Sequence, residues 1–186
     1  MASDPTRDVE DRLADLLDGV IGWLQFAESK NTGIVGLIST ALGVIVTFLL
    51  AGPSISTLAG AGLAVGAVML MISLLLAVAS FLPATDLERY LVGEDQPPGS
   101  GENLLFYGHL ARYNPLVLVR AVASHYAELT PDEFAVSKLA RDLAEQIMTN
   151  ARITVRKLRL YRAALLLFGS GVLIAAAAMA LAAFAG

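Results

Sequence analysis

Histidine is the side chain that most often moves protons near neutral pH, and this chain of 186 residues has two, His109 and His125. They lie sixteen residues apart, and neither belongs to an HExxH zinc motif. The chain also has no nucleophile elbow, phosphate-binding loop or paired-carboxylate motif, and no cysteine for a disulfide or a thiolate metal site. We therefore expect no catalytic residue, no metal and no cofactor, and we predict that the protein is not an enzyme.

Four small or weakly polar residues share one face of an apolar segment: Gly36, Thr40, Gly43 and Thr47. Their spacings of four, three and four are those of a helix. In lipid, such a stripe lets helices approach closely, because glycine adds no bulk and hydroxyl groups can bond across the interface. The same stripe can line a water-filled path in an oligomer. The sequence leaves both interpretations open, and it makes these four residues the candidate pore lining.

An acidic stripe precedes this segment and contains Asp4, Asp8, Asp11, Asp15 and Asp18. The usual explanation of such a stripe is a solvated helix face. If several copies met around an axis, Asp11, Asp15 and Asp18 would instead form rings that concentrate cations at the mouth of a pore. We predict these three residues as a candidate cation vestibule.

Rings and cations that could bind a nucleotide occur together in the middle of the chain. Tyr107, His109, Arg112 and Tyr113 lie within seven residues, and folding can add Arg120, Arg152 and Arg156. Aromatic side chains stack on bases, and arginine forms paired hydrogen bonds with phosphate. The alternative is an aromatic cluster that only packs.

The elements that would position these residues are membrane helices. Hydrophobic residues make up 56% of the chain and charged residues only 16%. Residues 31–85 and 163–186 contain no Asp, Glu, Lys or Arg, and a bilayer crossing needs about 20 apolar residues. Gly52, Pro53 and Ser54 divide the longer stretch, so we predict spans at 32–51, 55–82 and 163–184. Gly62 and Gly66 of the second span have a GxxxG spacing, which we attribute to chance or to packing within the chain.

Positive residues next to the spans predict the orientation. Lys30 precedes the first span, five more precede the third, and the turn at residues 52–57 has none. The five are Arg152, Arg156, Lys157, Arg159 and Arg162. We therefore predict that the charged segments, including the amino terminus, are cytoplasmic.

Start signals and periodicity predict an all-α protein whose long helices continue into the membrane. An amphipathic helix at residues 5–30 leads into the first span without a strong break. Asn114 and Pro115 predict a helix to Tyr126. A capping box at residues 130–133 predicts that the last helix begins at Pro131 and runs for about 50 residues. The predicted domains are a cytosolic helix at 1–31, a transmembrane hairpin at 32–84, a cytosolic helical region at 85–160 and a third transmembrane helix at 161–186.

Several segments resemble the membrane effectors of bacterial Pycsar-type immune systems. Phe26 to Asn31, read as FAESKN, is similar to the entry of the first span in that family, and Leu105 to Ala111 is similar to its mid-chain motif. Leu143 to Arg159 resembles the helix that enters the last span. The match covers nearly the whole chain in the same order.

The resemblance implies an anti-phage effector whose cytosolic region senses a nucleotide signal and whose membrane region perturbs the inner membrane. Relatives respond to cyclic mononucleotides, and the similar ion-channel effector of the Hailong defence system responds to short single-stranded DNA oligomers. A nucleotide cyclase or nucleotidyltransferase would be the functional partner. We therefore expect a homo-oligomeric channel, a tetramer, that causes growth arrest or abortive infection. The alternative is a nonconducting membrane anchor or signalling subunit that binds a partner protein through its cytosolic helices.

Overall fold

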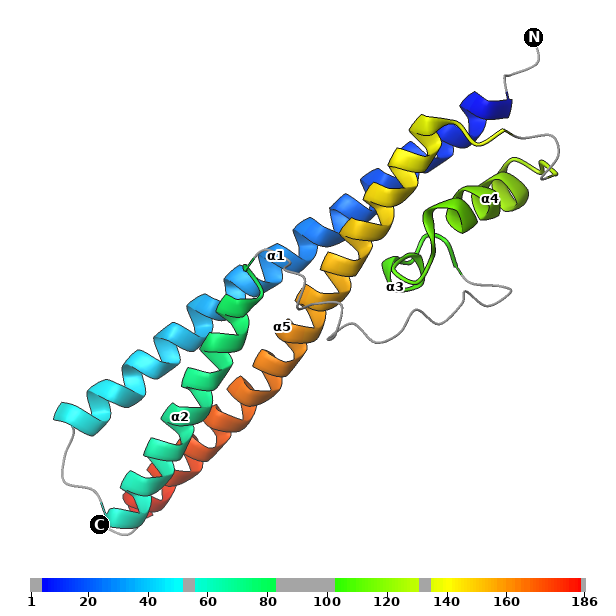
Figure 1. Cartoon of the computed structure of the whole chain (residues 1–186). Helices are drawn as coiled ribbons and strands as arrows, with labels where there is room; N and C mark the ends of the chain where they lie inside the picture. The colour runs from blue at the N-terminus through cyan, green and yellow to red at the C-terminus, as the bar shows by residue number, and fades with distance from the viewer. Residues whose placement is uncertain (1–4, 52–55, 83–102, 131–134, 185–186) are drawn as a thin grey trace. The chain divides into compact units, whose positions relative to one another are not determined.

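The computed structural model describes residues 5–51, 56–82, 103–130 and 135–184 (Figure 1). Their regular elements are all helices: α1 (Pro5–Ala51), α2 (Thr57–Ala79), α3 (Tyr107–Leu110), α4 (Pro115–Tyr126) and α5 (Lys138–Phe184). Helices α1, α2 and α5 are long and apolar enough to cross a bilayer. The predicted all-α membrane fold with three transmembrane helices is therefore confirmed. The predicted turn at residues 52–54 lies outside the described residues.

Helix α1 is continuous over 47 residues, as its sequence predicts. Pro5 stands at its first position, and the single glycines along it are tolerated because each costs only about 1 kcal/mol relative to alanine. One side of its first half is buried through Val9, Leu13, Leu16 and Val20. The amphipathic pattern therefore directs this half of α1 against other helices.

The predicted start of the last helix is wrong. Helix α5 begins at Lys138, and residues 135–137 are not helical. The cap is Ser137, whose Oγ accepts a hydrogen bond from the backbone N–H of Ala140 at 3.0 Å and donates one to Glu10 Oε1 at 2.6 Å. This contact with α1 gives Ser137 a tertiary partner that a local capping signal cannot reveal. Residues 131–133 of the predicted capping box lie outside the described residues.

The predicted start of α4 is confirmed. Asn114 has extended backbone angles, and its Oδ1 accepts a hydrogen bond from the N–H of Leu116 at 3.0 Å. Pro115 occupies the first turn, where a missing N–H removes no helical hydrogen bond. The helix ends at Tyr126, also as predicted.

The chain folds into two compact units. The α4 unit combines Met1–Phe26 with Ala84–Arg156, and the spanning unit combines Ala27–Pro83 with Lys157–Gly186. The α4 unit has its own core, in which the apolar side of α1 packs with α4 and the first half of α5. Its most buried members include Leu13, Leu118, Val122, Ala144 and Ile147.

Helices α2 and α5 approach each other closely in the spanning unit. A Cβ at Gly66 would lie 3.0 Å from the carbonyl oxygen of Gly171, and one at Gly171 would lie 3.1 Å from the carbonyl oxygen of Gly66. Seven residues further along α2, the Ser73 hydroxyl donates a 2.7 Å hydrogen bond to the carbonyl of Ala164, which is seven residues earlier in α5. The two helices are therefore antiparallel, and small residues line their contact.

The GxxxG spacing of α2 is used within the chain. A Cβ at Gly62 would lie 2.7 Å from Cβ of Ala178, and Gly66 meets Gly171. Close contact between helices in lipid depends on such residues, because a larger side chain would separate the backbones. The interpretation of this motif as intrachain packing is confirmed.

Candidate functional site

The predicted pore-lining residues lie on the side of α1 that faces away from its own core. Ile34, Ile38 and Ile45 of α1 are buried in the spanning unit. The four predicted residues are all exposed: Gly36, Thr40, Gly43 and Thr47. Among the described residues, nothing beyond the local helix lies within 4 Å of a Cβ placed at either glycine. Within the described residues of this one chain, the stripe therefore takes no part in helix packing.

The hydroxyl of Thr40 is satisfied within α1. Its Oγ1 donates a 2.9 Å hydrogen bond to the carbonyl oxygen of Gly36, one turn earlier. Thr32 makes the same kind of bond to the carbonyl of Glu28 at 3.0 Å. A threonine bonded in this way can face lipid, and its oxygen can still accept a hydrogen bond from water. The stripe is therefore compatible with either environment.

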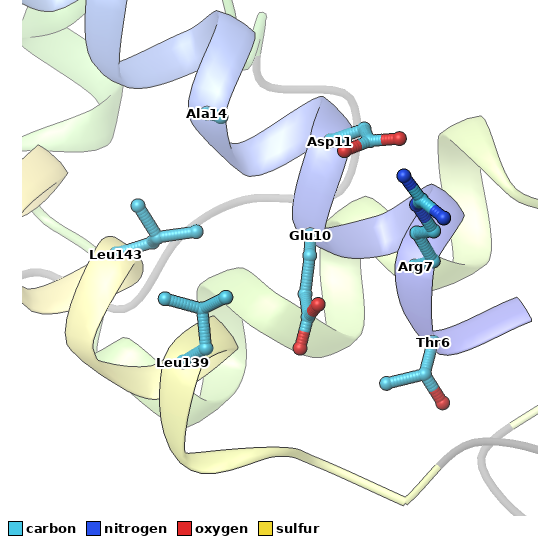
Figure 2. Close-up of a pocket in the computed structure, with 7 residues that line it drawn as sticks. All are labelled: Thr6, Arg7, Glu10, Asp11, Ala14, Leu139 and Leu143. Carbon is cyan, nitrogen blue, oxygen red and sulfur yellow. The ribbon is translucent and has the colours of Figure 1, made fainter.

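The predicted cation vestibule lies on the exposed side of the first half of α1. Asp11, Asp15 and Asp18 are exposed, and they belong to the α4 unit. Asp11 also lines an open depression of about 480 Å³ between the start of α1 and the start of α5. Figure 2 shows Leu139 and Leu143 of α5 opposite Glu10 of α1 in this depression. Asp15 and Asp18 are not among its lining residues.

The structure places the predicted nucleotide-binding rings in an aromatic cluster. The ring of Tyr107 lies 4.6 Å from that of Phe106 and 5.2 Å from that of Trp23, measured between centroids. The Nδ1 atom of His109 accepts a 3.0 Å hydrogen bond from the N–H of Asn103. Tyr113 is buried in the core of the α4 unit. These rings therefore serve the packing of the unit, and only some of their surface can meet a ligand.

The predicted arginines divide into a structural residue and exposed ones. The Nε atom of Arg152 donates a 3.0 Å hydrogen bond to the carbonyl oxygen of Ala111, which connects α5 to the end of α3. Arg112 and Arg120 are exposed, and Arg156 is half-buried. Of the four predicted arginines, Arg112 and Arg120 are thus the two most accessible to a phosphate. Among the described residues no group of three or more His, Asp and Glu side chains could hold a metal.

A polar layer in the spanning unit was not predicted from the sequence. Lys157 Nζ lies 3.1 Å from Glu28 Oε1 and 5.6 Å from the centroid of the Phe81 ring. The lysine is almost fully buried, whereas the glutamate side chain is half-exposed. Glu28 and Lys157 are 129 positions apart, so no local signal could have paired them.

Asn31 lies on the same buried side of α1 as Ala27 and Ile34. Its side chain is fully buried, and neither Oδ1 nor Nδ2 has a hydrogen-bond partner among the described residues. Buried amides are nearly always bonded, because an unmet donor or acceptor costs about 1–3 kcal/mol. Among the described residues of the spanning unit, Asn31 is therefore the buried side chain whose hydrogen-bonding groups are left unmet.

Comparison with known families explains this combination of helices. The sequence model of the Pycsar effector protein domain matches residues 12–184, a range that includes most of α1 and all of α2 to α5. No curated protein and no solved structure gives a significant match. The matched range is most of the chain, and it confirms the resemblance carried by the motifs at residues 26–31, 105–111 and 143–159. The chain therefore belongs to the Pycsar effector protein domain family, and the protein is an anti-phage defence effector with a transmembrane domain.

Proposed function

We propose that this effector is an oligomeric pore of the bacterial inner membrane that is controlled by a nucleotide signal and stops growth during phage infection. The observation that carries the proposal is the exposed stripe of Gly36, Thr40, Gly43 and Thr47, which α1 presents away from its own core. A span that met only lipid would have no need of two hydroxyl groups and two glycines on one face.

In the proposed oligomer, the stripe of each copy faces a central axis. Glycine leaves room for a path, and the hydroxyl oxygens of the threonines can accept hydrogen bonds from water along it. A tetramer would place four such stripes around the axis, and the exposed Asp11, Asp15 and Asp18 of each copy would add acidic rings on the cytoplasmic side. Opening such a path dissipates ion gradients without a chemical reaction, so we propose no enzymatic step.

The α4 unit is proposed to lie in the cytoplasm and to bind the signal. The positive residues that precede the first and third spans support this orientation. Exposed Arg112 and Arg120 supply charge for phosphate, and the half-buried rings of Tyr107 and His109 supply contact area for a base. A cyclic mononucleotide and a short single-stranded DNA oligomer are the two candidate signals, made by a cyclase or a nucleotidyltransferase.

Conductance across a planar bilayer tests the proposal. The purified full-length protein should give discrete current steps, and cyclic mononucleotides or short single-stranded DNA should change the open fraction. Replacing both Arg112 and Arg120 with glutamine should remove the response to the nucleotide while leaving the steps. A protein that never conducts, with or without these molecules, is not a pore.

Two substitutions in the stripe separate a pore from a nonconducting anchor. Thr40→Leu and Thr47→Leu together should abolish the current and the toxicity of overexpression, because bulky apolar side chains fill the proposed path. Leu75→Phe is the matched control, since it enlarges an exposed position of α2 and should leave both intact. Toxicity that survives the double substitution, with partner binding unchanged, would favour the anchor.

A further inference from the structure

An exposed apolar patch lies where the part of α1 that belongs to the α4 unit ends, at Phe26. We call it the Trp23 patch and define it as Trp23, Phe26, Leu105 and Phe106, which are 40, 46, 66 and 39% exposed. Trp23 and Phe26 make an edge-to-face contact at 5.9 Å, and Tyr107 lies between Trp23 and Phe106. Ring contacts through Tyr107 therefore join Trp23 and Phe26 to Phe106, whose chain neighbour is Leu105, and this apolar surface remains exposed outside the core.

The register of α1 connects the patch to the lipid-facing side of the helix. Trp23, Phe26 and Lys30 are followed by Leu37 and Val44 at spacings of three, four, seven and seven, so all five share one helical face. Leu37 and Val44 are 60 and 65% exposed inside the span. A span needs exposed apolar side chains where it meets acyl chains, and along the continuous helix α1 the patch lies in register with two such side chains, Leu37 and Val44.

The distance along α1 from Glu28 to Trp23 matches the thickness of the lipid headgroup layer. Phe81 follows the end of α2 by two residues and packs on Lys157, and Lys157 pairs with Glu28 of α1. Trp23 precedes Glu28 by five residues, about 7.5 Å along the helix axis. The headgroup layer occupies roughly 5–8 Å on each side of the hydrocarbon core. Tryptophan and its aromatic neighbours favour this layer because their rings are apolar with a polar edge.

We propose that the Trp23 patch seats the α4 unit on the bilayer surface, with phospholipid headgroups and the adjoining acyl carbons as its partner. The four side chains carry no charge, which suits ester groups and upper acyl chains better than the phosphate of a nucleotide. Leu105, the most exposed of the four, is aliphatic and offers no ring face to a base. The inference does not depend on the proposed pore, because an anchor would use the same surface.

The chain contains one tryptophan, so its fluorescence reports on Trp23 alone. The full-length protein is reconstituted in vesicles whose lipids carry bromine either near the headgroup or near the chain end. Trp23 should lose most of its emission with the shallow bromine and little with the deep one. Emission equal to that in unbrominated vesicles would overturn the proposal without affecting the conductance test.

A paired substitution tests whether the α3 side of the patch takes part. Leu105→Ser with Phe106→Ser should reduce the quenching of Trp23 by the shallow bromine, because it removes apolar surface from the proposed contact. Leu139→Ser is the control, since Leu139 is comparably exposed in the α4 unit but faces the start of α1. Quenching of Trp23 in this variant should match that in the parent protein.

Two results in detergent would assign the patch to another partner. If the parent protein loses its Trp23 emission on adding nucleotide, the patch is a base-stacking surface. If the Trp23 emission instead changes with protein concentration, the patch is a contact between copies. Either result would overturn the proposal.

Discussion

Lys157 is a charged side chain held almost entirely inside the spanning unit. Its ammonium group meets the carboxylate of Glu28 at 3.1 Å and the face of the Phe81 ring at 5.6 Å. The stem of a lysine packs well on apolar surface, and the glutamate keeps contact with water because it is half-exposed. Losing the partner should therefore cost more free energy of folding for the buried lysine than for the half-exposed glutamate.

The two members of the pair should respond differently to neutral substitutions. Glu28→Gln leaves the buried ammonium group without its carboxylate, and it should destabilise the protein by somewhat less than the roughly 3–5 kcal/mol seen for fully buried pairs. Lys157→Met keeps the packing on Phe81 and leaves a carboxylate that reaches water, so it should cost less. Thermal unfolding midpoints in detergent measure both. Equal losses would mean that Lys157 is solvated in the folded protein.

Asn31 provides a second test at the residue scale. Replacing it with leucine removes two unmet polar atoms at similar volume, so the unfolding midpoint should rise, by on the order of 1–2 kcal/mol of stability. Asn31→Ala is the control, because it removes the same polar atoms but leaves a cavity and should not stabilise. A leucine variant that melts below the parent would show that the amide makes a favourable contact in the folded protein.

At the scale of helices, local sequence signals predicted the helix ends that local hydrogen bonds determine. The cap of α4 follows from adjacent residues, and Asn114 with Pro115 identifies it in sequence and in structure. The start of α5 is capped by Ser137, which also donates a hydrogen bond to Glu10, 127 positions away, and a capping box elsewhere misled the prediction. The continuity of α1 was predictable because a single glycine is a weak break.

The contact between α2 and α5 gives a prediction at this scale. Gly66→Leu should lower the unfolding midpoint by the equivalent of about 2 kcal/mol or more, because the side chain would collide with the backbone of Gly171. Gly33→Leu is the matched control on α1, where nothing stands within 4 Å and leucine improves helix propensity. If both variants unfold at the same temperature, the close approach of α2 and α5 does not stabilise the unit.

At the scale of the whole molecule, the sequence predicted the kind of protein better than its site. Charge-free stretches reveal spans because charges are costly in lipid. The site residues depend on contacts between distant segments, such as Trp23 with Tyr107 and Arg152 with Ala111. Trp23 was missed because a lone aromatic residue on an amphipathic helix has no distinguishing local pattern.

Assembly can be tested with single cysteines, because the chain has none of its own. In the proposed oligomer Thr47→Cys should form a disulfide-linked dimer on mild oxidation in membranes, since the stripes of neighbouring copies converge on one axis. Ile38→Cys should stay monomeric, because Ile38 is buried in the core of its own chain. An amine-reactive cross-linker should give bands up to four copies. Dimers from Ile38→Cys alone would place the opposite side of α1 at the interface.

Helix α5 contributes to both cores, with Ala140, Ala144 and Ile147 in the α4 unit and Ala164, Ala175 and Ala178 in the spanning unit. It is also the last of the described helices to leave the ribosome, and the partner of Ser73 lies 91 residues downstream. Neither core is complete until translation has passed the part of α5 that belongs to it. A nascent chain of this anti-phage effector therefore cannot have its native membrane core before most of α5 has been made.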